Sequence, residues 1–309
     1  MATTTPTSNN PPRSPPSLAV SNRPKDGPAT SFEADEMAKL LIENKDKDTT
    51  YGLVLVAAWP PSPAWREIYA NRIRPRLAAC FPSDIMEDCG TSSSSSVYIY
   101  PPEALHVTLA TFWSIHCQET ISQGQTVDLE RSVKAVVERA WQQYQNNFPH
   151  ERHFVLEVES AQIGTKAGII LWKESSGRLN AFRRVLHQTC QEECQRLEES
   201  CSLHEEPVDT NAAFVRHALS QIKVPDIVHS TVVRFSETPI TEGVVVQRNF
   251  ERFILDQLST ELVPHSFPVH TIKLVCERQP YMHVPPDDRH VLWASTLGKD
   301  DPKTWSESS

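Results

Sequence analysis

The chain of 309 residues has no apolar run long enough to cross a membrane and no N-terminal apolar stretch of the signal-peptide type. It has no excess of basic residues either, since 30 Lys and Arg stand against 39 Asp and Glu, for a formal net charge of −9. A protein that binds long duplex nucleic acid needs a basic face to neutralise phosphates, so this charge balance argues against that class. A small phosphate-bearing ligand needs only a few positive or donor groups and stays compatible with it.

The seven cysteines contain no pair with C-x-x-C spacing, which argues against a structural zinc site. Their number is odd and most are scattered, so reduced thiols in a cytoplasmic or nuclear protein are the simplest interpretation. Import into an organelle stays open as an alternative, because the first 25 residues carry Arg13 and Arg23 and no acids. The many prolines there argue against an amphipathic targeting helix. We expect neither a metal nor a cofactor.

Composition divides the chain into three parts. Residues 1–49 are predicted to be a tail that is disordered where Pro, Ser and Thr dominate, with a short helix over residues 33–43 as an option. Residues 50–299 are predicted to form one folded domain, and residues 300–309 a polar tail.

Apolar, strand-like runs and amphipathic helical stretches alternate through the domain in the order β–α–β–α–β–β–α–β–α–β–β. The two halves have the same pattern: each offers a strand with a His-x-Thr triplet, then a helix, then a pair of strands. This order predicts an α+β fold with two sheet-and-helix lobes.

The two His-x-Thr triplets lie within apolar runs, LHVTL at 105–109 and VHSTV at 228–232. Because side chains alternate along a strand, His106 shares a face with Thr108, and His229 shares a face with Thr231. One such triplet is close to chance in a chain with twelve histidines. Two triplets in equivalent places are a stronger signal, because polar pairs in apolar strands need partners or a function.

Two imidazoles and two hydroxyls around one phosphate can hydrolyse a phosphodiester without a metal. One histidine accepts a proton from the attacking water and the other donates one to the leaving alkoxide, and each transfer contributes roughly 10²–10⁴-fold. The threonine hydroxyls would donate to the non-bridging oxygens. The residues leave open which histidine is the acid. Tyr281 and Trp59 are candidates for stacking a base.

These runs, ALHVTLATF and DIVHSTVVRF, resemble the motifs of the 2H phosphoesterase superfamily. The opening YGLVLVAAWPP and the closing IKLVCERQPYMH and HVLWASTLG extend the resemblance over residues 51–298. It implies a bilobal fold with a central cleft and metal-independent hydrolysis of a 2′,3′-cyclic phosphate to a 2′-phosphomonoester. The substrate would be a nucleotide, an RNA end or an ADP-ribose cyclic phosphate.

Carried over by position, the resemblance implies His106 and His229 as catalytic residues and Thr108 and Thr231 as phosphate ligands. It also implies Arg234 as a further phosphate ligand. Simple alternation places Arg234 on the face opposite His229, so a bulge or the strand end must intervene if it contacts ligand.

The second motif departs from the family pattern at Ser230 and Val232, where an apolar residue and Leu are commoner, and Ser230 becomes a small polar residue on the core side. The segment at about residues 198–225 is also longer than in compact members of the family, so we expect an insertion that forms a lid or a partner surface. Two other functions stay open: a non-catalytic module that binds a nucleotide or RNA end, and a 2′–5′ phosphodiesterase or RNA ligase. Intact imidazoles and hydroxyls in both motifs favour the enzyme. The expected partner is a nucleotide or an RNA 2′,3′-cyclic phosphate end, with no membrane and no extended duplex.

Overall fold

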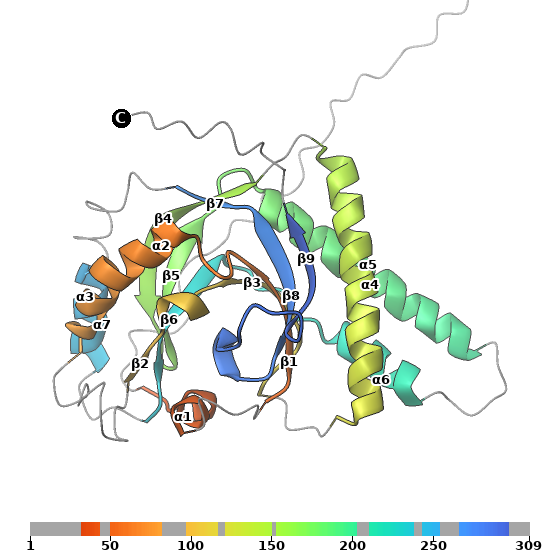
Figure 1. Cartoon of the computed structure of the whole chain (residues 1–309), viewed down its shortest axis with the longest axis horizontal. Helices are drawn as coiled ribbons and strands as arrows, with labels where there is room; N and C mark the ends of the chain where they lie inside the picture. The colour runs from red at the N-terminus through yellow and green to blue at the C-terminus, as the bar shows by residue number, and fades with distance from the viewer. Residues whose placement is uncertain are drawn as a thin grey trace, which may run out of the picture.

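The computed structural model of the protein describes residues 32–43, 50–81, 97–116, 121–149, 153–202, 210–237, 243–253 and 266–296. Its strands form two antiparallel sheets, each covered by its own group of helices (Figure 1). The predicted α+β fold with two sheet-and-helix lobes is therefore confirmed. Most of the predicted N-terminal tail and all of the C-terminal tail lie outside the described residues.

The first sheet joins strands from the beginning and the end of the domain, in the order β3-β1-β8-β9. Its strands are β1 (Gly52–Ala57), β3 (Val107–Trp113), β8 (Thr271–Glu277) and β9 (Val291–Thr296). Three helices pack together beside this sheet (Figure 1): α4 (Gln123–Asn147), α5 (Arg178–Ser202) and α6 (Thr210–Ser220). Helix α4 begins with a capping box formed by Ser122 and Gln125, and its buried stripe packs on α5 through Trp141 and Phe182.

The second sheet has the strand order β2-β6-β5-β4-β7. Its strands are β2 (Val97–Ile99), β4 (Phe154–Ile163), β5 (Ala167–Lys173), β6 (His229–Phe235) and β7 (Phe267–Val269). Its helices are α2 (Pro63–Ile68), α3 (Arg74–Ala78) and α7 (Gly243–Phe253), and a π-helical turn, Tyr69–Ile73, joins the first two. Trp65 of α2 packs against Trp172 of β5 and Phe267 of β7, with ring centroids 5.3 and 4.7 Å away, so α2 is anchored on this sheet.

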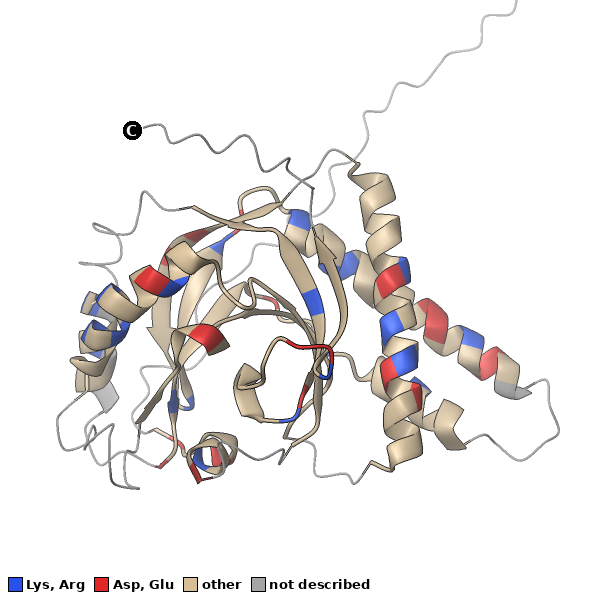
Figure 2. Ribbon diagram, viewed as in Figure 1, with Lys and Arg blue, Asp and Glu red and all other residues tan. Residues whose placement is uncertain are grey.

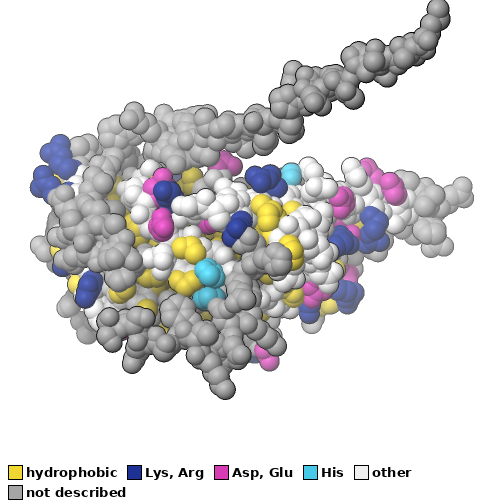
Figure 3. Space-filling model, turned by 90° about the horizontal axis from the view of Figure 1, so that it is seen from above, with side chains coloured by type: hydrophobic (Ala, Val, Ile, Leu, Met, Phe, Trp, Pro, Cys, Tyr) yellow, Lys and Arg dark blue, Asp and Glu magenta, His cyan; other side chains and the backbone are white. Residues whose placement is uncertain are grey.

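Charged side chains lie mainly on the helices, above all on α4 and α5, and only a few lie along the strands (Figure 2). On the face seen in Figure 3, the described Lys and Arg side chains are scattered among acidic, apolar and neutral ones. No described helix combines the length and the apolar character that a membrane span requires.

Residues 32–43, which composition assigned to the N-terminal tail, pack on the domain. Phe32 is only 2% exposed and stacks on Phe235 with ring centroids 4.3 Å apart. The backbone N–H of Asp35 donates to the carbonyl of Phe235 at 2.7 Å, and helix α1 (Glu36–Glu43) follows. The partners of this segment lie about two hundred positions further along the chain, so local composition could not reveal them.

The described part of the expected insertion at about residues 198–225 is helical up to Ser220, and residues 221–225 form a non-helical segment in which Lys223 pairs with Thr111. Helix α5 continues to Ser202, and α6 packs against both α4 and α5. Phe214 of α6 contacts Trp113 of β3, with ring centroids 5.1 Å apart. The described part is therefore a component of the helical layer beside the first sheet, and not a separate lid; residues 203–209 lie outside the described residues.

Candidate active site

The first motif lies at the start of β3, where strand bulges set the direction of its side chains. In the pairing with β1, Thr108 lies opposite Val56 and Ala110 opposite Leu55, so Leu109 is an extra residue. A second register shift follows before Trp113. Thr108 and Thr111 are half-buried, and so is His106 just before the strand, whereas their neighbours along the strand are buried. His106, Thr108 and Thr111 therefore share one face.

The second motif, in β6, contains a matching bulge. Thr231 pairs with Ile169 and Val233 pairs with Gly168, so Val232 is the extra residue. His229, Thr231 and Arg234 are half-buried, while the residues between them are buried. The bulge moves Arg234 onto the face of His229. This confirms the condition set from the sequence, that a bulge must intervene.

The two motif strands are held beside each other by the chain itself. The backbone N–H groups of Thr111 and Lys223 each donate to the other residue's carbonyl, at 2.8 and 2.9 Å, so the segment leading into β6 runs along the edge of β3. Arg183 of α5, only 3% exposed, donates from Nη2 to the carbonyls of Thr108 at 2.9 Å and Ile227 at 3.3 Å. One buried guanidinium therefore joins the backbones of both motifs. Burial lowers the pKa of Arg183 to about 10, which leaves it charged at neutral pH.

His106 is oriented by the carbonyl two residues before it. Its Nδ1 lies 2.8 Å from the carbonyl oxygen of Ala104. Because a carbonyl can only accept, Nδ1 carries the proton, and Nε2 is left to exchange a proton with a ligand. At His229 the Nδ1 makes no such hydrogen bond to the described residues, although the nearby carbonyl of Ile227 raises the pKa of this histidine.

Burial keeps both imidazoles neutral in the free protein. It lowers the pKa of His106 to about 4, against the raising effect of the Ala104 carbonyl, and nearby His229, His283 and Arg234 lower it further. Burial also lowers the pKa of His229, with contributions from Arg183 and Arg234. The effect of His229 on the pKa of His106 indicates that the two motif histidines lie near each other. A bound phosphate anion would favour protonation of either imidazole.

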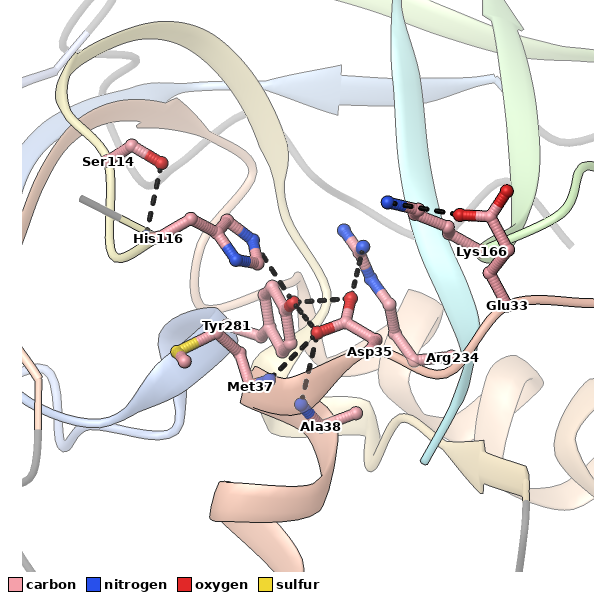
Figure 4. Close-up of polar contacts among 9 residues, drawn as sticks. All are labelled: Glu33, Asp35, Met37, Ala38, Ser114, His116, Lys166, Arg234 and Tyr281. Carbon is pink, nitrogen blue, oxygen red and sulfur yellow. Dashed lines mark hydrogen bonds and ion pairs between the residues drawn. The ribbon is translucent and has the colours of Figure 1, made fainter. Parts of the chain in front are cut away.

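Arg234 is held in place by two residues from distant segments. Its Nη1 pairs with Oδ2 of Asp35 at 2.7 Å, and its guanidinium lies 4.4 Å from the centroid of the Tyr281 ring. The hydroxyl of Tyr281 donates to the same carboxylate at 2.6 Å (Figure 4). Burial alone would raise the pKa of Asp35, but the hydrogen bond from Tyr281 and the charge of Arg234 lower it below its usual range. Arg234 therefore lies on the motif face in a fixed geometry.

The two aromatic candidates for base stacking are corrected by the structure. Trp59 is 1% exposed and packs with Val54, Val56 and Met282 in a small core of its own. Tyr281 is 7% exposed, and Arg234 lies over its ring. Both rings are buried, as is usual for large aromatic side chains, so neither offers an open face on which a base could stack.

The site also contains polar residues that the sequence analysis did not assign to it. Tyr98 of β2 lies opposite Arg234 in the strand pairing, and its hydroxyl contacts Nε2 of His283. The Nδ1 of His283 lies 2.9 Å from the carbonyl of Pro280, so Nε2 accepts from Tyr98. His283 is also close enough to His106 to lower its pKa. Tyr98 could have been found from the register of β2 on β6, whereas the contacts of Asp35 and Arg183 left no signal in the sequence.

Two cavities flank the motif residues at opposite ends of β3. One, of about 150 Å³, is lined by His106 and Val107 together with apolar residues such as Pro60 and Trp65. The other, of about 240 Å³, begins at Thr111 and is bounded by the last turn of α6. Among the described residues, no three His, Cys, Asp or Glu side chains converge in a group that could hold a metal ion.

Ser230 lies on the core side of β6 and has a hydrogen-bond partner there. Its hydroxyl accepts the indole N–H of Trp172 at 3.0 Å, so the departure from an apolar residue supplies a partner for a buried donor.

No protein-family model matches the sequence, and no curated protein sequence matches it. Solved structures do match. A crystal structure of a phosphoesterase matches with 14% identity and a TM-score of 0.39, covering 81% of this chain and 99% of its own. E. coli LigT complexed with 3′-AMP matches with 13% identity and a TM-score of 0.40, over 81% and 99% of the two chains. The protein TT0787 of Thermus thermophilus matches with 14% identity and a TM-score of 0.37, over 80% and 97%. At this level of similarity, function has to be inferred from the site itself.

Proposed function

We propose that the protein is a metal-independent phosphodiesterase of the two-histidine type. Its substrate would be a 2′,3′-cyclic phosphate on a nucleotide, an RNA end or ADP-ribose, and its product a 2′-phosphomonoester. One observation supports this above all: β3 and β6, which belong to different sheets, each carry at their start a half-buried His and Thr on one face, and a bulge in each strand extends this face by one more polar residue, Thr111 on β3 and Arg234 on β6. A purely structural pair would not need the same construction twice.

The proposed reaction divides the work between the two imidazoles. His106, whose pKa is lowered to about 4, is assigned the role of base, and through Nε2 it accepts a proton from the attacking water. The water oxygen bonds to phosphorus as the bond to the 3′ oxygen breaks. His229 is assigned the role of acid and protonates that departing oxygen. The phosphate remains on the 2′ oxygen.

The remaining groups would stabilise the charge on the phosphate. The hydroxyls of Thr108 and Thr231 would donate to its non-bridging oxygens, one from each strand. Arg234 would add a positive charge that Asp35 and Tyr281 hold in position. Groups that are fixed before the substrate binds need no reorganisation during the reaction, which is the main source of electrostatic catalysis.

The test is to incubate the full chain with 2′,3′-cyclic AMP in excess EDTA and to follow the phosphorus signals by ³¹P NMR. We expect conversion to adenosine 2′-monophosphate that EDTA does not reduce. A His106→Ala/His229→Ala variant should be inactive, while His187→Ala, an exposed histidine of α5, should match the wild type.

Each alternative predicts its own result in the same assay. Loss of activity in EDTA, or full activity in the double variant, would overturn the mechanism. A non-catalytic binding module would bind the nucleotide and yield no product over hours. A 2′–5′ phosphodiesterase would cleave 2′–5′ oligoadenylate in preference to the cyclic nucleotide.

A further inference from the structure

We propose that the cavity beyond Thr111 is a second anion subsite, which binds a phosphate one nucleotide away from the reacting phosphate. The inference rests on the proposed function and narrows its substrate class. The preferred substrate would be an RNA end, or another compound with a second phosphate, and not a mononucleotide cyclic phosphate.

The position of this subsite follows from the two motif faces. Each face has three tiers: the histidines, then Thr108 and Thr231, then Thr111 and Arg234. The third tier lies three residues beyond the threonines, and because each bulge adds one residue, this span matches two positions of the partner strand, or roughly 7 Å. One nucleotide unit of a flexible single strand can bridge that span. A substrate bound at the first two tiers would therefore bring its next phosphate to the third.

The cavity at the third tier is built from donors on three separate elements. Beside Phe112, Trp113 and Ala218, it is lined by polar side chains of β3, of the turn after β3, and of the end of α6 and the segment that follows it: Thr111, Ser114, His116, His217, Gln221 and Lys223. The backbone pairing of Lys223 with Thr111 fixes this segment against β3. Hydroxyl, amide, imidazole and ammonium groups together are suited to phosphate oxygens.

Lys223 and His116 are the side chains near the cavity that we expect to bind an anion. Arg234 is paired with Asp35 at 2.7 Å, and Lys166 with Glu33 at 3.2 Å, so these two cations are partly neutralised. Figure 4 places Tyr281 and Asp35 between His116 on one side and Arg234 on the other. After burial, the nearby Arg234, Lys166 and Lys223 are what lower the pKa of His116, against the raising effect of Asp35. Lys223 is therefore the cation near His116 for which the described residues show no carboxylate partner, and a bound phosphate would lie between these two side chains.

The experiment compares two probes that differ only in the charge of one linkage. Adenylyl-(3′→5′)-adenosine 2′-phosphate is titrated into the full chain by calorimetry, beside the same compound with an uncharged methylphosphonate linkage. We expect the charged probe to bind about tenfold more tightly, the effect of one charge-assisted hydrogen bond. Lys223→Ala and His116→Gln should each bring this ratio towards one. Lys134→Ala, an exposed lysine of α4, should leave the ratio unchanged.

The outcomes separate this inference from the proposed function. Equal affinities of the wild type for the two probes would overturn the subsite, and so would a ratio that survives in both folded variants. A preserved preference for the charged probe, with no hydrolysis of the corresponding 2′,3′-cyclic dinucleotide, would support the subsite and reject the phosphodiesterase. Both side chains are exposed, so folding of the variants is expected and is checked by their thermal transitions.

Discussion

Replacing Arg183 with methionine removes the guanidinium that joins the two motif strands while keeping much of the side-chain volume. The carbonyls of Thr108 and Ile227 lose a charged donor at 2.9 and 3.3 Å. Each hydrogen bond to a charged group contributes about 1.5–3 kcal/mol. Relief of the buried charge offsets part of that loss. We expect the free energy of unfolding to fall by about 2–4 kcal/mol.

The effect on activity should be larger than the effect of a distant core substitution of equal cost. Thr108 is a proposed phosphate ligand, and a displacement of about 1 Å in a positioned group can reduce the rate roughly 10²-fold. We therefore expect kcat/KM on 2′,3′-cyclic AMP to fall about a hundredfold. The pKa of His229 should also rise, because the charge of Arg183 is one of the causes that lower it.

The assay combines steady-state kinetics with an NMR titration of the histidine ring protons. Arg184→Met, an exposed neighbour on α5, is the matched control and should behave as the wild type. A folded Arg183→Met protein with kcat/KM within about twofold of the wild type would refute the positioning role. An unchanged pKa of His229 would refute its electrostatic part.

Three further results are expected. The kcat/KM on 2′,3′-cyclic AMP should be highest below about pH 6.5, because burial lowers the pKa of both His106 and His229. An acid–base pair works best between its two pKa values, so an optimum at pH 7 or above would contradict this expectation. Asp35→Asn should lower the free energy of unfolding by about 3 kcal/mol at neutral pH, through the broken pair with Arg234. Since the pKa of Asp35 is lowered in the folded protein, the stabilisation is present above about pH 4 and is lost as the pH falls further. If urea unfolding shows that Asp35→Asn lowers the free energy of unfolding equally at about pH 7 and about pH 3, the ion pair is ruled out as the cause. Ser230→Ala should cost about 1–3 kcal/mol by leaving a buried indole N–H without its acceptor, and a loss under about 0.5 kcal/mol in chemical denaturation would show that another group replaces the hydroxyl.

Alternation and element order were enough to predict the two lobes and the faces of the motifs. His106 with Thr108, and His229 with Thr231, lie as the period of a strand requires, because apolar neighbours on both sides fix which face is buried. The same rule could not decide on which face of the strand Arg234 lies. The extra residue at Val232 reverses the alternation of side chains, and no feature of the composition signals a bulge there.

Contacts over long sequence separations account for the rest. Asp35 lies in a segment assigned to the tail, and its partner Arg234 is 199 positions away. In the sequence, Arg183 looks like a charged residue on the solvent side of an amphipathic helix, whereas in the structure its guanidinium is buried between two strands. Trp59 and Tyr281 could be chosen as aromatic candidates, but their burial depends on how the segment after β8 folds back over the sheet.

The central claim is that the two histidines act together in one hydrolytic step. Its most direct test is single-turnover hydrolysis of 2′,3′-cyclic AMP in EDTA by the wild type, His106→Asn, His229→Asn and the double variant. The account predicts that each single substitution lowers the rate by roughly 10²–10⁴-fold. It also predicts that the double variant is little slower than the slower single variant, because residues that act as a unit are not additive. Hydrolysis at the wild-type rate by either single variant would contradict the claim.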